Sequence, residues 1–269
     1  MSRIKIIAEI GWNFLGDIDL AKKMIVDAKN AGANIAKFQY WDPATLKKGS
    51  WDEDGRRQIY EKAALDERKI NILKKICDEE EINSLFSVFT LKSAEKLKLV
   101  GEKNIKIPSH EINNKELIKF AGDNFDFVFL STGASIEEEV IDATKILKSS
   151  KSEFNLMHCV SSYPCELSSS NLPRINWLKL LHDKVGLSDH TQSTLPPALA
   201  VSMGATVIEK HFTSNNNLDG RDNKFALNPE NFKKMVNLIN ETEKCLNYLG
   251  NNYLDSESDT VENYRGRWG

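Results

Sequence analysis

Several features that would assign a protein to a well-known class are missing from this sequence. No block of basic residues occurs and the formal net charge is −3, so we expect no nucleic acid partner. No apolar run approaches the roughly 20 residues of a membrane-spanning helix, and the first residues are too interrupted for a signal peptide. The four cysteines show no CxxC spacing, which is typical of reduced thiols in a cytoplasmic protein. Membrane association and a disulfide scaffold are therefore not expected.

The composition is that of a globular protein with a large core. The chain has 269 residues, of which 41% are hydrophobic and 28% charged. Eight apolar runs resemble strands and alternate with amphipathic, helix-like stretches. The expected strands are residues 4–10, 35–38, 84–89, 105–107, 127–130, 155–159, 184–187 and 206–209. This alternation predicts an α/β fold of the (β/α)8 TIM-barrel type over residues 1–250, followed by a polar C-terminal arm over residues 251–269.

An open, doubly wound sheet is the alternative to a closed barrel, although no GxGxxG or P-loop sequence is present to favour it. Four glycines follow helical patterns, and we predict that they end those helices: Gly32, Gly101, Gly122 and Gly204. Residues 40–65 interrupt the alternation. A loop of this length in a compact domain predicts a binding function.

Two histidines follow neighbouring strands of the predicted barrel. His190 comes after residues 184–187, and His211 comes after residues 206–209. A strand–helix–strand unit brings both strand ends to the same edge of a parallel sheet. Two imidazoles there can share one divalent cation, and the absence of an obvious third protein ligand would leave coordination positions open, as a catalytic metal requires. The alternative is two unrelated, hydrogen-bonded histidines.

Two lysines lie inside expected strands, where a charged residue is rare unless it is paired. Lys37 and Lys106 therefore predict a bound anion, such as a phosphate or carboxylate. A core salt bridge with Glu9, Glu111 or Glu209 is the alternative for each lysine. Hydroxyl groups that could add hydrogen bonds to an anion follow other strands, at Ser109, Ser131, Thr132 and Ser161.

Taken in order, these motifs resemble the sialic acid synthase (N-acetylneuraminate synthase) family, over about residues 6–250. The segments that carry the resemblance are Ala8-Glu9-Ile10-Gly11, Lys37-Phe38-Gln39, Ile105-Lys106-Ile107, Ser131-Thr132-Gly133, residues 158–164 (HCVSSYP), Ser188-Asp189-His190-Thr191 and residues 204–213 (GATVIEKHFT). The resemblance implies an enzyme that condenses phosphoenolpyruvate with an aldehyde amino sugar, similar to N-acetylmannosamine. The product would be a nonulosonic acid, formed with C–O cleavage and release of phosphate, as in transferases of class EC 2.5.1.

The resemblance also implies roles for individual residues. His190 and His211 would hold Mn²⁺ or Mg²⁺, which polarises the sugar aldehyde, and Glu9, Glu111 and His211 would be catalytic. Phosphoenolpyruvate would lie among Lys37, Ser87, Lys106, Ser109, Ser131, Ser161 and Tyr163. Glu9, Gln39 and Asp222 would contact the sugar. A cytoplasmic homodimer is expected.

The sequence departs from the family mainly where the sugar is expected. After Glu-Ile-Gly-x the family usually has an Asn-His pair, but after Trp12 this sequence has Asn13-Phe14, so any polar role of that His is lost. The resemblance ends before the family's usual antifreeze-like domain, whose Arg reaches a partner's sugar site, and we expect the arm to supply an Arg instead. Two alternatives stay open. One is a synthase for another aldehyde sugar, such as a phosphorylated one bound by Arg56, Arg57 or Arg221, and the other is a non-catalytic barrel.

Overall fold

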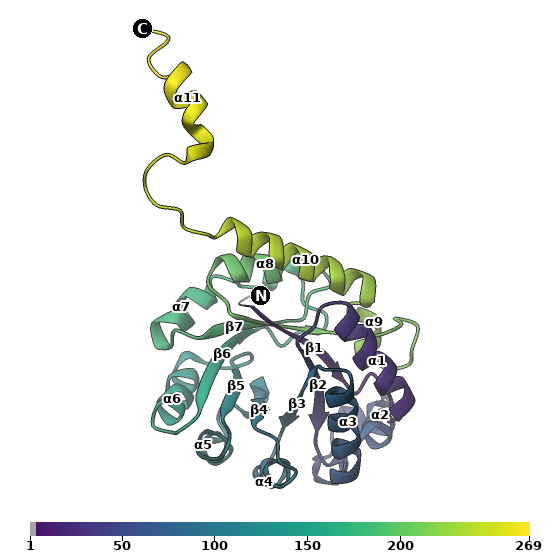
Figure 1. Ribbon diagram of the computed structural model, residues 1–269. Helices are drawn as coiled ribbons and strands as arrows, with labels where there is room; N and C mark the ends of the chain where they lie inside the picture. Colours follow the sequence, from purple (N-terminus) through teal and green to yellow (C-terminus); the bar gives the residue numbers. More distant parts are fainter. Residues whose placement is uncertain (1–3) are drawn as a thin grey trace.

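The computed structural model describes residues 4–269 and consists of a closed barrel of eight parallel strands with helices around it (Figure 1). The strands neighbour one another in sequence order, and β1 pairs with β8 to close the barrel. Their bounds are β1 Lys5–Gly11, β2 Ile35–Tyr40, β3 Asn83–Val88, β4 Asn104–Ile107, β5 Phe127–Ser131, β6 Glu153–Cys159, β7 Val185–Asp189 and β8 Val207–His211. The predicted TIM barrel is confirmed, and each strand lies within two residues of its predicted bounds.

Helices follow the strands and cover the outside of the barrel. The main ones are α1 Ile18–Asn30, α3 Glu67–Glu79, α4 Leu91–Leu99, α5 Lys115–Asn124, α6 Glu137–Lys148, α7 Arg174–Leu181, α8 Leu195–Ser202 and α10 Pro229–Cys245. Short helices lie in the connections: η1 Pro43–Thr45, η2 Ser50–Asp52, α2 Arg56–Ala63, η3 Ser109–Glu111, η4 Leu167–Ser169 and α9 Arg221–Phe225.

Three of the four predicted helix-ending glycines are confirmed. Gly32, Gly101 and Gly204 follow α1, α4 and α8 with φ values of +98°, +79° and +98°, a conformation that glycine adopts without strain. The prediction for Gly122 is wrong, because this residue lies inside α5. A Cβ at Gly122 would come within 2.6 Å of the Ser150 side chain, so close packing against the end of α6 explains the glycine.

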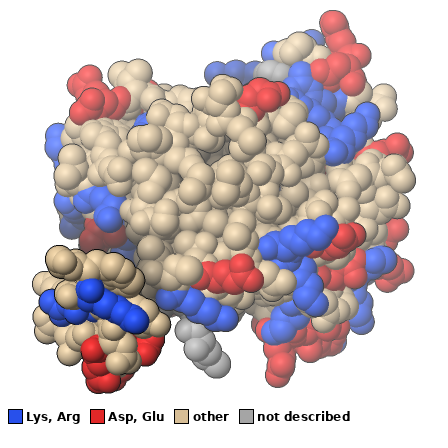
Figure 2. All heavy atoms as spheres, turned by 90° about the horizontal axis from the view of Figure 1, so that it is seen from above, with Lys and Arg blue, Asp and Glu red and all other residues tan. Residues whose placement is uncertain are grey.

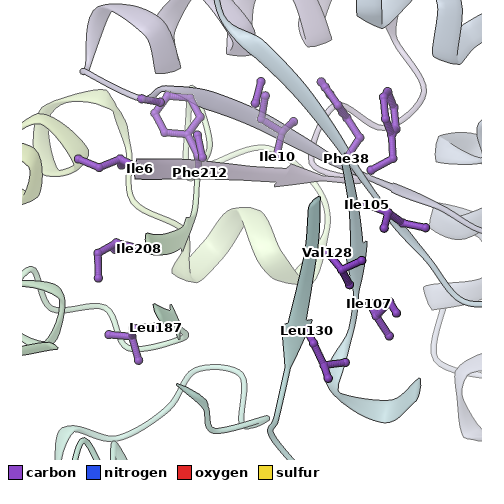
Figure 3. Packing of buried hydrophobic residues seen from close by; sticks show 14 of the residues in the cluster. Ile6, Ile10, Phe38, Ile105, Ile107, Val128, Leu130, Leu187, Ile208 and Phe212 are labelled. Atoms are coloured by element: carbon purple, nitrogen blue, oxygen red, sulfur yellow. The ribbon is translucent and has the colours of Figure 1, made fainter. Parts of the chain in front are cut away.

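Apolar side chains form two layers. The larger layer fills the space between the strands and the surrounding helices, and Figure 3 shows part of it around Ile6, Phe38 and Leu130. A smaller cluster fills the barrel interior and consists of Ile7, Ile35, Leu85, Phe129, Met157 and Val207. Alternation along a strand places the residue two positions later on the same, inward face. On five of these six strands that residue is polar, and on β6 it is a cysteine: Glu9, Lys37, Ser87, Ser131, Cys159 and Glu209. The apolar cluster is thus the floor of a polar layer.

The excursion over residues 40–65 is more ordered than the sequence predicts, since it contains η1, η2 and α2. The C-terminal arm includes η5 Asp255–Glu257 and α11 Ser258–Asn263, and it extends away from the barrel beyond α10 (Figure 1). Seen from above, charged side chains of both signs gather around the rim of the molecule, and a broad central area carries none (Figure 2). Over residues 4–269, no helix has the length and apolar character needed to cross a membrane.

Candidate active site

A cavity of 510 Å³ opens above the polar layer, at the carboxyl ends of the strands. Active sites of TIM barrels lie at this end. Twelve of the predicted site residues line the cavity: Glu9, Lys37, Gln39, Ser87, Lys106, Ser109, Glu111, Ser131, Tyr163, His190, His211 and Asp222. Ser161 does not line it and is exposed. Its hydroxyl lies 3.8 Å from the thiol of Cys159, which does line the cavity.

Four buried charges form the centre of the cavity floor. Lys37 Nζ lies 2.9 Å from Glu9 Oε2 and 3.4 Å from Glu209 Oε1, and Lys106 Nζ donates to Glu209 Oε2 at 2.6 Å. No member is more than 4% exposed. Two lysines and two glutamates give this cluster a formal charge of zero, which is how an interior can hold four ions.

The salt-bridge alternative for the two lysines is therefore confirmed with Glu9 and Glu209, but not with Glu111. Burial would raise the pKa of Glu209, but Lys106 and Lys37 outweigh burial and hold that pKa well below its usual range. For Glu9 burial prevails over Lys37 and raises the pKa. For Lys106 burial prevails over Glu209 and lowers the pKa.

Lys106 keeps more free donor capacity than Lys37. The ammonium group of a lysine has three N–H donors. Lys37 contacts Glu9 and Glu209 and also donates to Ser87 Oγ at 2.8 Å, whereas Lys106 donates to Glu209 alone among the described residues. An anion in the cavity would find unused donors on Lys106.

His190 and His211 lie side by side above this cluster, with ring centroids 5.3 Å apart. His190 Nδ1 donates to the carbonyl oxygen of Val160 at 2.8 Å, which directs Nε2 towards the cavity. His211 Nδ1 is buried, has no hydrogen-bond partner in the described part of the chain and lies 3.6 Å from Asp222 Oδ2. Burial and the neighbouring His190 lower the pKa of His211 far below its ordinary value, so its imidazole is neutral. For His190, contact with Cys159 outweighs burial and raises the pKa.

This pair fits a divalent metal with open coordination positions. Both Nδ1 atoms face the protein, so two Nε2 atoms remain for an ion. Within residues 4–269 no group of three or more His, Cys, Asp or Glu side chains converges on one point, so the protein would supply two ligands and solvent or substrate the others.

Hydroxyl groups line the opposite side of the cavity. Ser109 Oγ accepts a hydrogen bond from the backbone N–H of Gly133 at 3.0 Å. A Cβ at Gly133 would come 2.6 Å from Ser161 Oγ and 2.9 Å from Ser109 Oγ, so only glycine fits there. Glu111 Oε2 accepts from Asn114 Nδ2 at 3.0 Å and forms part of the cavity wall.

Aromatic rings from the excursion form a second wall. Tyr60 of α2 stacks on Trp12 with centroids 4.1 Å apart, and Trp41 meets Tyr60 edge-on at 4.3 Å. Arg56 and Arg221 line the mouth, but each already has a partner: Arg56 pairs with Asp54, and Arg221 donates to the Tyr163 carbonyl oxygen at 2.7 Å. Arg57 is not among the lining residues and pairs with Asp52.

Sequence reasoning did not assign a site role to Glu209, Ser188, Cys159 or Trp12, all of which line the cavity. Strand alternation could have predicted that Glu209 lies in the site, because Glu209 precedes His211 by two residues on β8 and so faces the same way. Trp12 gave no such signal, because its partner Asp222 is 210 residues away in sequence.

Comparison with known proteins finds relatives that match most of the chain. A profile described as the NeuB family matches residues 24–250. The chain is 32% identical to a pseudaminic acid synthase of Campylobacter jejuni over 97% of this chain and 79% of that one. It is 34% identical to an N,N'-diacetyllegionaminic acid synthase of the same organism over 91% and 78%. The solved N-acetylneuraminic acid (sialic acid) synthetase of Leptospira borgpetersenii, in complex with citrate, superposes with a TM-score of 0.87 at 32% identity, covering 96% of this chain and 90% of that one.

Proposed function

The chain belongs to the NeuB family, and from this premise we propose that it condenses phosphoenolpyruvate with an aldehyde amino sugar to give a nonulosonic acid. The observation that carries the proposal is one cavity that combines buried lysines, hydroxyl groups and two histidines whose Nε2 atoms are free. Its relatives are named for pseudaminic and diacetyllegionaminic acids, and these names support the product class. The sugar itself is an N-acetylmannosamine-like aldehyde in this proposal.

Phosphoenolpyruvate would bind over the charged floor. Its phosphate and carboxylate groups would take the unused donors of Lys106 and the hydroxyl groups of Ser87, Ser109 and Ser131. Glu209 stays ionised beneath them, because Lys106 and Lys37 stabilise its charge. The charged floor would thus orient phosphoenolpyruvate while Glu209 keeps its negative charge.

The sugar would bind above, towards the mouth. Glu9 and Gln39 present polar atoms there, with Gln39 Nε2 donating to Glu9 Oε1 at 2.8 Å, which fixes both side chains. Trp12, Trp41 and Tyr60 would exclude water from this side. Glu111 would stabilise charge or move a proton near the reacting carbons.

The proposed reaction joins C3 of phosphoenolpyruvate to the aldehyde carbon. A water molecule then adds to C2 of the resulting cation, and the tetrahedral intermediate loses inorganic phosphate by cleavage of its C–O bond. A divalent metal, Mn²⁺ or Mg²⁺, would supply Lewis-acid polarisation of the aldehyde oxygen when bound to His190 and His211. Atoms balance as one phosphoenolpyruvate, one aldehyde and one water giving one keto acid and one phosphate.

A different aldehyde acceptor is the second candidate. The arginines do not favour a phosphorylated one, since Arg56 and Arg221 are already partnered and Arg57 does not line the cavity. The test is phosphate release from phosphoenolpyruvate with Mn²⁺ and a panel of aldehyde sugars, using His211→Ala as the control. Release that depends on one N-acylated sugar supports the proposal; no release with any sugar contradicts it.

A further inference from the structure

The buried nitrogen of His211 faces a single carboxylate. His211 Nδ1 is buried without a hydrogen-bond partner in the described part of the chain, and Asp222 Oδ2 is 3.6 Å away. Asp222 is 6% exposed and comes from α9, a helix of only five residues. A carboxylate beside the outer nitrogen of a metal-binding imidazole fixes its tautomer and ring orientation.

Trp12 holds this carboxylate in place. Its Nε1–H donates to the same Oδ2 atom at 2.7 Å, across the junction between β1 and β8. The adjacent cation, Arg221, is turned away, because it donates to the Tyr163 carbonyl oxygen and lies over the Tyr163 ring. In the described part of the chain, the indole therefore supplies the side-chain hydrogen bond that sets the direction of the Asp222 carboxylate.

The indole ring is itself fixed by the excursion. Tyr60 stacks on Trp12 with an interplanar angle of 14°, and Trp41 contacts the same ring edge-on at 5.8 Å. Contacts thus run without interruption from α2 through Trp12 and Asp222 to His211.

We propose that Trp12 is a positioning residue for the metal-binding histidine. The inference rests on the proposed function. In it, Trp12 contacts neither the metal nor the reacting atoms. Its indole orients Asp222, and Asp222 accepts from His211 Nδ1–H, so that Nε2 is presented to the ion. A cation on Nε2 makes Nδ1–H a stronger donor, which would shorten the 3.6 Å separation.

The experiment measures Mn²⁺ affinity by electron paramagnetic resonance of the free ion, without substrates, at one fixed pH. Trp12→Phe keeps an aromatic face for Tyr60 and removes the N–H donor together with part of the ring area. Trp177→Phe is the matched control, since Trp177 of α7 does not line the cavity. We expect Trp12→Phe to weaken Mn²⁺ binding about 3- to 10-fold and Asp222→Asn about 10- to 100-fold. Trp177→Phe should match the wild type.

Two further measurements separate positioning from a general loss of structure. The double variant Trp12→Phe/Asp222→Asn should bind Mn²⁺ as Asp222→Asn does, because Trp12 acts only through Asp222. The indole N–H signal of Trp12 in a ¹⁵N–¹H spectrum, identified by its loss in Trp12→Phe, should shift in Asp222→Asn. Wild-type affinity in Trp12→Phe, or additive effects in the double variant, would overturn this inference alone. No Mn²⁺ binding by the wild type would overturn the metal site and the inference together.

Discussion

The charged floor of the cavity leads to a prediction about stability. Glu209→Gln preserves the size of the side chain and removes one negative charge, so the four-residue cluster changes from neutral to a net charge of +1. Among residues 4–269, Glu209 is the one carboxylate within salt-bridge distance of Lys106, and the variant removes it. Removing one partner of a buried ion pair costs about 3–5 kcal/mol, because the other charge is left uncompensated.

Thermal and urea unfolding measure this cost directly. At roughly 2–4 °C per kcal/mol for a protein of this size, the midpoint should fall by about 6–20 °C. Glu153→Gln is the matched control, because it removes the same charge from an exposed pair with Lys184. We expect no measurable change there, since solvent screens that pair. An equally small effect of Glu209→Gln would refute the reasoning.

The stability difference between the wild type and Glu209→Gln should also depend on pH, in a direction that follows from the pKa of Glu209. The pKa of Glu209 is held well below its usual range in the folded protein, with Lys106 and Lys37 outweighing burial. A depressed carboxyl pKa stabilises the fold at pH values above the unfolded pKa, about 4.3 for Glu. The difference between wild type and Glu209→Gln should therefore be full at neutral pH and shrink as the pH falls below that value. A difference that grows in acid would contradict the assignment.

A double variant isolates the pair itself. Glu209→Gln/Lys106→Met leaves Lys37 and Glu9 as a neutral pair. Replacing both members of a buried ion pair is often nearly neutral, so the double variant should be more stable than the sum of the single effects predicts. Strict additivity would mean that the two side chains do not interact.

The remaining predictions concern metal, anion and thiol chemistry. His211→Ala should abolish Mn²⁺ binding measured by calorimetry while its circular dichroism spectrum stays that of the wild type; retained binding would exclude His211 as a ligand. Lys106→Met should raise the dissociation constant of phosphoenolpyruvate about tenfold or more, because a hydrogen bond to a charged group is lost, and an unchanged constant would leave Lys106 a purely structural ion. Iodoacetamide should modify exposed Cys245 in the folded protein but not Cys77, since burial raises the pKa of Cys77 to about 12; mass spectrometry of the labelled peptides decides this.

Much of the fold follows from local sequence patterns. The strands are short apolar runs bounded by glycine or polar residues, and their number and spacing predicted the barrel that the structure contains. Gly122 shows where local reasoning fails. This glycine allows close packing of α5 against Ser150, which follows α6, and no local pattern encodes that contact.

Site residues that lie on strands could be predicted from strand alternation. Contacts that form only when β1 pairs with β8 to close the barrel could not. Lys37, Lys106 and His211 lie on strands, and their inward direction follows from the period of two. The contact between Trp12 and Asp222 joins the first and last parts of the chain through the β1–β8 pairing. Ser161 was expected in the site but is not among the residues that line the cavity, although Cys159 and Tyr163 on either side of it are.

One measurement tests the proposed condensation most directly. The protein is incubated in ¹⁸O-labelled water with phosphoenolpyruvate, Mn²⁺ and the aldehyde sugar that supports phosphate release. ³¹P nuclear magnetic resonance then reports the isotope content of the released phosphate, and mass spectrometry reports that of the keto acid. We predict unlabelled phosphate and label in the keto group, because water adds to carbon and the C–O bond breaks. Label in the phosphate would mean P–O cleavage and would contradict the proposed reaction.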